Sequence, residues 1–255
     1  MSGRHSGARD VIAYNWPQYA AGLATAAGAA AVAGHLPRPL RRLARSGSAA
    51  AITLLGTATA ASWYVYDRSD LYAYHWLASL LPRTPSAYVV VSCGLDEVSA
   101  PLAARWPAAR RSAVDLYDPA LTSEGSIRRA RRRVPPPAHA LPGRPDTLPL
   151  PTAGTDAVLL VFAAHELRRA RDREELFTEC GRILRPGGTL VLTEHLRDIA
   201  NTAAFGPGAW HFLPRAEWLR LAAHAGLRPT AERRLAHLIT AFAFTKDETC
   251  PNSSP

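Results

Sequence analysis

Hydrophobic and polar positions follow two different patterns along the chain, and the change lies near residue 66. Before it, residues 11–37 and 46–66 form two long runs without Asp, Glu, Lys or Arg. After it, short apolar runs of strand length alternate with segments of helical periodicity. We therefore expect an N-terminal helical hairpin over residues 1–66, an α/β domain over 67–246 and a disordered tail over 247–255.

The α/β domain is predicted to contain seven strands, connected mainly by helices. Apolar and β-branched runs predict the strands at 88–92, 112–117, 138–141, 155–163, 189–195, 227–234 and 237–245. Amphipathic segments predict helices at 98–106, 121–133, 172–185 and 214–225, the last capped by Gly226. This alternation predicts a doubly wound, mainly parallel, Rossmann-like sheet, which binds its ligand at the carboxyl ends of the strands.

The two uncharged runs predict a hairpin whose relation to a membrane is open. Each run could cross the roughly 30 Å hydrocarbon core of a bilayer as a helix. The linker between them, residues 38–47, carries Arg38, Arg41, Arg42 and Arg45. Ala, Gly and Thr dominate both runs, which makes insertion marginal. We expect the hairpin to associate with a membrane, spanning it or lying in one leaflet, with the α/β domain on the cytoplasmic side; the alternative is a soluble helical cap in the cytoplasm.

Composition narrows the classes of partner. The formal charge of +9 comes almost entirely from arginine, because Lys246 is the only lysine. The chain is also rich in Ala, Pro and Gly, as GC-rich codon usage produces, so we expect no nucleic-acid partner. The densest basic patch, residues 128–133, is interpreted as a solvated helix end. Cys93, Cys180 and Cys250 lie far apart without a C-x-x-C pair, so we expect neither a metal site nor a disulfide framework.

The clearest motifs lie between residues 146 and 198. "DTLPLPTAGTDAVLLVFAAHEL" carries L-P-x-P before an apolar strand, and "ELFTECGRILRPGGTLVLTEHLRD" carries a helix-to-strand turn. Pro186 cannot continue the helix, and Gly187 and Gly188 can take a positive φ. Together these stretches resemble the class I S-adenosylmethionine-dependent methyltransferases of the small-molecule type (type 11). The resemblance covers residues 66–245 and is weakest in the loop after the first strand.

The resemblance implies S-adenosylmethionine as the cofactor, and it implies where the cofactor binds. The loop after the first strand corresponds to Ser92, Cys93, Gly94, Leu95 and Asp96, with Ser92 and Asp96 where the family usually has glycine. An acid after the second strand binds the ribose in this family. Asp115 and Asp118 are both candidates, and only one of them can face the ribose from a regular strand. Asp146 and Thr147 are expected near the adenine, and Phe162 after the fourth strand.

The same resemblance locates the reacting end of the site. His165 and Glu166 follow the fourth strand and His195 ends the fifth, close to the methyl group in this family. Either histidine could remove a proton from the acceptor; alternatively each only hydrogen-bonds a loop or caps a helix. The insert at 201–218 is expected to wall an apolar acceptor pocket. Tyr72, Trp76, Phe205, Trp210 and His211 complete the predicted substrate site.

We therefore expect methyl transfer to a hydrophobic small molecule of secondary metabolism, such as a quinone, polyketide, terpenoid or lipid, at a membrane. The loss of glycines from the cofactor loop supports an alternative. In that alternative the chain keeps the methyltransferase shape and acts as a scaffold or partner, or carries out other chemistry. The sequence does not determine the oligomeric state.

Overall fold

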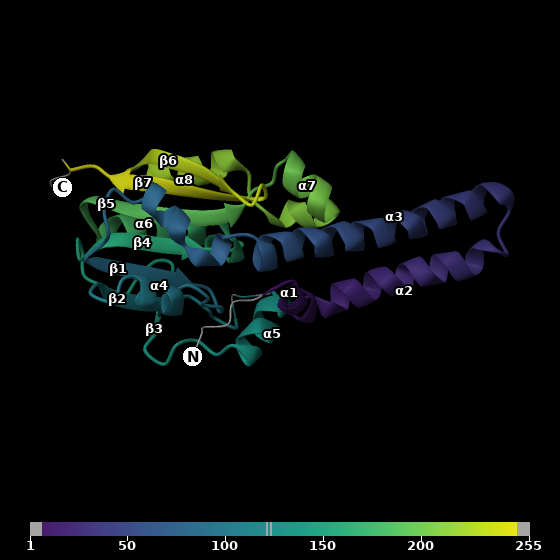
Figure 1. The fold of residues 1–255 in the computed structure, drawn as a ribbon, viewed down its shortest axis with the longest axis horizontal. Coiled ribbons are helices and arrows are strands. Elements are labelled where there is room, and N and C mark those ends of the chain that lie inside the picture. Colours follow the sequence, from purple (N-terminus) through teal and green to yellow (C-terminus); the bar gives the residue numbers. More distant parts are fainter. Residues whose placement is uncertain (1–6, 121, 123, 249–255) are drawn as a thin grey trace.

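The computed structural model describes residues 7–120, 122 and 124–248 of the chain. Within these residues, seven strands form one sheet with helices on both faces, and an N-terminal helical arm projects from it (Figure 1). Cys250 and residues 249–255 of the predicted tail lie outside the described residues, as does residue 121, where a helix was expected to begin.

The sheet has the doubly wound order that the alternating pattern predicts. Its strands are β1 (Ala87–Ser92), β2 (Arg110–Asp115), β3 (Leu141–Pro142), β4 (Thr155–Val161), β5 (Leu184–His195), β6 (Leu227–Leu235) and β7 (Ile239–Lys246). They lie in the order β3-β2-β1-β4-β5-β7-β6, and only β7 runs antiparallel to its neighbours. The strand order reverses between β1 and β4, which places a binding crevice at their carboxyl ends.

Helices cover both faces of the sheet because successive side chains of a strand point to opposite sides. Val89 and Val91 pack with the helices α6 (Ala170–Ile183) and α8 (Arg215–His224) on one face. Tyr88 and Val90 pack on the other face with α4 (Ser99–Arg105) and the short 3₁₀ segments Leu71–Ala73 and His75–Ser79. β1 is therefore buried along its whole length.

Several element boundaries differ from the sequence prediction. α5 spans Gly125–Arg133, and β2 ends at Asp115 rather than at 117. β5 begins at Leu184, before the Pro-Gly-Gly turn, and only Gly187 of the two glycines there has a positive φ, +72°. Gly188 is required for space instead, because a Cβ there would lie 2.8 Å from the Arg185 carbonyl oxygen.

The N-terminal part forms the arm, built from α1 (Ala8–Tyr14), α2 (Trp16–Ala33) and α3 (Arg38–Trp63), with α2 and α3 side by side (Figure 1). The expected arginine linker is wrong, because α3 begins at Arg38 and the connection is residues 34–37. Ser48 Oγ donates to the Ala26 carbonyl at 2.9 Å and locks the two helices together.

The arm was also expected to be able to span a membrane. Within the described part of the chain, none of the helices combines the length and the hydropathy that crossing a bilayer requires. The membrane-spanning form of the hairpin is therefore not supported.

Short helices connect the arm and the strands around the crevice. A π-helical turn, Tyr64–Arg68, continues α3 into the domain. Ala164–Glu166 follows β4, and α7 (Ile199–Phe205) with Gly206–His211 follows β5. These segments bring side chains from distant parts of the sequence to the carboxyl edge of the sheet.

Candidate active site

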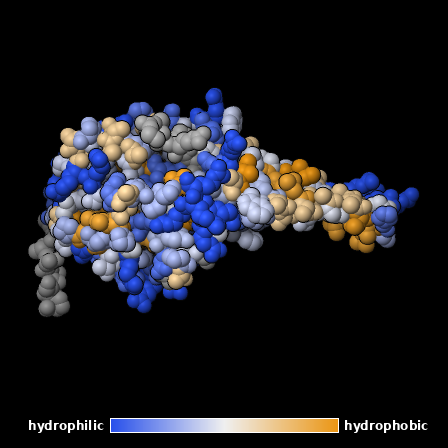
Figure 2. Space-filling model, turned by 90° about the horizontal axis from the view of Figure 1, so that it is seen from below, coloured by the Kyte–Doolittle hydropathy of each residue, from blue (hydrophilic) through white to orange (hydrophobic). Residues whose placement is uncertain are grey.

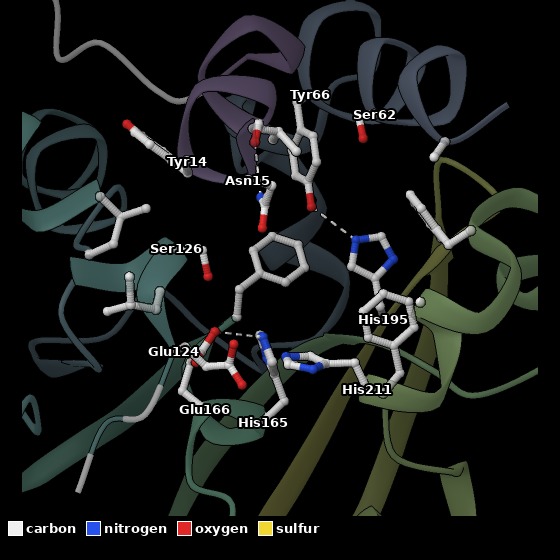
Figure 3. Close-up of a pocket in the computed structure, with 18 of the residues that line it drawn as sticks. Tyr14, Asn15, Ser62, Tyr66, Glu124, Ser126, His165, Glu166, His195 and His211 are labelled. Carbon is white, nitrogen blue, oxygen red and sulfur yellow. Dashed lines mark hydrogen bonds and ion pairs between the residues drawn. The ribbon is translucent and has the colours of Figure 1, made fainter. Parts of the chain in front are cut away.

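A pocket of about 640 Å³ lies at the carboxyl ends of β1, β4 and β5, under the base of the arm (Figure 3). Phe162 and His195 lie at the ends of β4 and β5, and Tyr66 comes from the end of the arm. Phe205 and Phe212 form an aromatic wall from the insert after β5. The pocket therefore joins the sheet edge, the arm and the insert in one site.

His195 is held in a single tautomer inside this pocket. Its Nδ1 lies 3.0 Å from Asn201 Oδ1, while Asn201 Nδ2 donates to Asp198 Oδ1 and to the Leu238 carbonyl, both at 3.0 Å. Because the amide nitrogen is already used, the amide oxygen faces His195 and Nδ1 carries the hydrogen. Nε2 is left as an acceptor for the Tyr66 hydroxyl, which donates at 2.9 Å.

The surroundings keep this pair neutral. Burial lowers the pKa of His195 to about 4, and it raises the pKa of Tyr66 well above the usual value of a tyrosine. The imidazole stacks between Phe162 and Phe212, with ring centroids 5.6 and 4.8 Å away. His195 therefore presents an unprotonated nitrogen near neutral pH, as a general base requires.

His165 has the opposite character, because it lies between two buried carboxylates. Its Nδ1 is 2.7 Å from Glu194 Oε2 and its Nε2 is 3.1 Å from Glu166 Oε1. Burial alone would lower the pKa of His165, but the charges of Glu194 and Glu166 outweigh it and raise that pKa to about 10. As an imidazolium it donates both hydrogens and has no free lone pair. The structure thus separates two histidines that the sequence left equivalent.

The divergent cofactor loop is shaped by its own side chains. Asp96 Oδ1 accepts from the backbone N–H groups of Val98 and Ser99, both at 2.9 Å, and so fixes the turn that leads into α4. Glu97 follows it on the pocket wall and accepts a hydrogen bond from the Tyr72 hydroxyl at 2.8 Å. This acid is suited to the positive charge of a sulfonium or an ammonium group.

A salt bridge occupies the position where the sequence predicts a ribose-binding acid. Asp115, at the end of β2, accepts the Gly94 N–H at 2.8 Å with Oδ1, and its Oδ2 pairs with Arg131 of α5. Asp118 instead accepts the Ala120 N–H at 2.8 Å outside the pocket. Of the two candidates, Asp115 lies next to the loop after β1, and its carboxylate is held by the protein itself.

The same helix fills the space beside Gly94. This glycine has φ +91°, and a Cβ there would lie 2.6 Å from Ile127 Cγ2 and 2.9 Å from Tyr117 Cδ2. The arginine run of α5 is not simply a solvated end, because Arg129 donates to the Tyr14 carbonyl at 2.5 Å and Arg131 pairs with Asp115. These contacts fix α5 against α1 and the sheet edge.

The residues present consequently fit S-adenosylmethionine at one end only. The pocket and Glu97 fit the methionine end and the methyl group. The adenosine end, which would lie against Gly94 and Asp115, is filled by Ile127, Tyr117 and Arg131. In this conformation α5 must move before those two residues can receive an adenosine.

The structure gathers many of the predicted site residues and leaves others apart. The pocket is lined by Cys93, Leu95, Phe162, His165, Glu166, His195, Tyr72, Phe205 and His211. Ser92, Gly94, Asp96 and Asp115 lie just behind it, in the loop and strand contacts described above. Cys93 is buried, and burial raises the pKa of its thiol to about 12.

Besides Asp118, four predicted residues are not brought to the pocket. Trp76 is buried and its indole donates to the Leu71 carbonyl at 2.8 Å, so it packs in the core instead of covering a cofactor. Trp210 is 74% exposed. Asp146 pairs with Arg144 at the surface, at 3.0 Å, and Thr147 is also exposed.

Sequence reasoning missed Tyr66, Glu97 and Asn201. Tyr66 was visible only as one of several aromatic residues before the first strand. Asn201 and Glu97 carried no signal, because a single amide or acid in a loop has no recognisable spacing. Their roles arise from contacts that only the folded chain creates.

Comparison with known proteins agrees with this fold. Residues 89–192, less than half of the chain, match a family described as a methyltransferase domain. No curated protein matches the sequence. A SAM-dependent methyltransferase from Aquifex aeolicus is similar in structure, with TM-score 0.51, 15% identity and coverage of 70% of this chain and 93% of that chain. The PH0226 protein from Pyrococcus horikoshii OT3 is also similar in structure, with TM-score 0.50 and 14% identity. That match covers 71% of this chain and 93% of that chain.

A third similar structure, PigF with SAH, has TM-score 0.50 and 14% identity, and covers 75% of this chain and 59% of that chain. At such identities the structures show the shared fold, and the domain match extends over residues 89–192. The chain thus has the fold of S-adenosylmethionine-dependent methyltransferases, and its residues 89–192 match a methyltransferase domain.

Proposed function

We propose that the protein transfers a methyl group from S-adenosylmethionine to a hydrophobic small molecule bound in the pocket, such as a quinone, polyketide, terpenoid or lipid. When bound, the cofactor supplies a methyl group on a positively charged sulfur. One observation carries the proposal: a neutral, buried His195 presents Nε2, through Tyr66, to a pocket with aromatic walls.

The side chains divide the work between binding and proton transfer. Glu97 and the loop after β1 would hold the methionine end, and Asp115 the ribose once Arg131 has moved away. Phe162, Phe205 and Phe212 would hold a flat apolar acceptor and exclude water. His195 would take the proton of an acceptor hydroxyl, directly or through Tyr66, as the oxygen attacks in line.

The arm supports a position at a membrane surface. Of twelve large hydrophobic side chains exposed in the described residues, nine lie between Trp16 and Tyr64. Figure 2 shows hydrophobic residues along the projecting arm, and hydrophilic residues beside hydrophobic ones at its far end, where α3 begins with Arg38, Arg41 and Arg42. Apolar sides with a basic tip suit an anionic lipid surface, where hydrophobic acceptors dissolve. The alternative is a cap that only covers the pocket.

A second function is favoured by the closed adenosine end. A protein whose Asp115 is permanently paired with Arg131 would keep the fold as a scaffold without methyl transfer. The two functions are distinguished by incubating the full chain with methyl-labelled S-adenosylmethionine and a panel of hydroxylated quinones and polyketides. Label in an acceptor, lost in a His195→Ala variant, supports the enzyme; no label with any acceptor, together with no cofactor binding, supports the scaffold.

A further inference from the structure

A cluster of metal-ligand side chains lies on the pocket wall, apart from the His195 pair. His165, Glu166 and His211 each offer one ligand atom, and these atoms all lie within 4.8 Å of one another. His165 and Glu166 come from the turn after β4, and His211 comes from the insert after β5, so the fold brings them together (Figure 3). Methyl transfer as proposed above uses none of the three.

The carboxylate of Glu166 is the second observation that points to a ligand. Glu166 is only 9% exposed, and its Oε1 faces His165 Nε2. Its other oxygen, Oε2, is buried and has no hydrogen-bond donor among the described residues. A buried carboxylate oxygen without a donor is costly, and a cation is what such a group lacks.

His165 is oriented as a metal-bound histidine is. Glu194 receives its Nδ1 hydrogen at 2.7 Å, which directs Nε2 toward Glu166 and the pocket. Metal-ligating histidines commonly give their second ring nitrogen to a carboxylate in this way. Without a metal, Nε2 needs a proton to face Glu166; a divalent cation replaces that proton and satisfies both groups.

We propose that His165 Nε2, the Glu166 carboxylate and His211 bind a divalent transition-metal ion of the Zn²⁺ type. Two imidazoles and one carboxylate are a ligand set that such ions favour, and three protein ligands leave a coordination position open. The position opens toward the pocket, where it could take an acceptor oxygen; this last step alone rests on the proposed function. The prediction from sequence that the chain has no metal site was based on the spacing of the cysteines. No cysteine belongs to the cluster proposed here.

Arg168 is the group that opposes this site. Its guanidinium contacts the His211 ring and pairs with Glu124 Oε1 at 3.0 Å. A fixed positive charge beside a ligand weakens cation binding. Because Arg168 is about one-third exposed, its side chain can turn toward solvent when a metal ion enters. Removing its charge should therefore strengthen the site.

Cobalt titration of the metal-free full chain tests the proposal without cofactor or acceptor. Co²⁺ should give a visible absorption band that saturates at one ion per chain and is displaced by Zn²⁺. His211→Ala and Glu166→Gln should each weaken Co²⁺ binding about 10-fold or more, Arg168→Gln should strengthen it, and His224→Ala, at an exposed position, should leave it unchanged.

Circular dichroism of each variant is the control for retention of the fold. Co²⁺ binding that is as tight in His211→Ala and Glu166→Gln as in the native chain would overturn the proposal. So would the absence of saturable binding in both the native chain and Arg168→Gln. Cation binding does not require methyl transfer, so a failure here is distinguishable from a failure of the proposed function.

Discussion

At the scale of the residue, the hydrogen-bond partners of each histidine decide what that histidine can do. Glu194 and Glu166 hold His165 as a cation, whereas the Asn201 amide and the Tyr66 hydroxyl hold His195 neutral. The two pKa values therefore move in opposite directions, to about 10 and about 4. Such separation is how an active site obtains distinct roles from one residue type.

The first prediction concerns His195 as the general base. His195→Ala should lower kcat for a hydroxylated acceptor by about 10²- to 10⁴-fold, because general-base catalysis contributes that much, and should leave cofactor affinity unchanged. Tyr66→Phe should lower kcat less, because the acceptor can still reach Nε2. Steady-state kinetics of the three proteins check this; an undiminished kcat in His195→Ala would contradict it.

A second prediction follows from the pKa of His195. The neutral form dominates above about pH 4, so kcat should be flat from pH 5 to 8 in the native protein. Asn201→Asp places a negatively charged carboxylate beside His195 Nδ1 and should raise the pKa of His195. The acid limb of the kcat profile should therefore move to higher pH. A pH profile of kcat for both proteins measures the shift, and an acid limb at the same pH in both would refute the assignment.

The third prediction concerns stability at alkaline pH. The pKa of His165 is raised from 6.5 to about 10 in the folded chain, so its stabilisation is complete below pH 6.5 and is lost as pH rises through 10. Without metal, the free energy of unfolding should therefore fall between pH 7 and 10, by on the order of 2 kcal/mol. Urea unfolding with a chelator present measures it, and His165→Gln should flatten the slope.

At the scale of the element, α5 controls access to the adenosine end of the site. Arg131 forms a salt bridge with Asp115, and the Ile127 side chain occupies the space that a side chain on Gly94 would need. Arg129 and Arg133 tie the same helix to α1, at Tyr14 and Asp10. Movement of α5 is therefore coupled to the base of the arm.

The fourth prediction tests this closure. Arg131→Gln should free Asp115 and tighten S-adenosylmethionine binding about 10-fold, the effect of removing a competing ion pair of about 1.4 kcal/mol. Arg132→Gln, an exposed neighbour on the same helix, is the matched control and should not change the affinity. Weaker binding in Arg131→Gln, with the melting temperature retained, would show that Arg131 helps to hold the cofactor instead.

The fifth prediction concerns the arm. Leu43 and Ile52 are 70% and 57% exposed on α3, and replacing both by Glu should abolish flotation of the full chain with vesicles containing anionic lipid. Leu141→Glu, exposed outside the arm, should float like the native chain. If the native chain does not float, the arm is a cap rather than a membrane element.

At the scale of the whole molecule, the fold followed from local patterns and the site only in part. Buried apolar runs and helical periodicity predict strands and crossovers, and the right-handed crossover rule then restricts the topology. The positions of His165, Phe162 and His195 near the pocket could be predicted, because these residues lie at or just after the ends of predicted strands. The position of Tyr66 could not, because it reaches His195 across 129 positions of sequence. The role of Arg131 could not be predicted either. A basic run at a helix end usually faces water, whereas here α1 packs against the arginine run of α5.

Equilibrium binding of S-adenosylmethionine to the full native chain tests the central claim most directly. Isothermal titration should show saturable binding of one cofactor per chain in the micromolar to submillimolar range, about 1 μM to 1 mM, typical of enzyme ligands. The absence of binding heat at millimolar cofactor, in both the native chain and Arg131→Gln, would contradict the account. Opening the adenosine end would then have failed to produce cofactor binding.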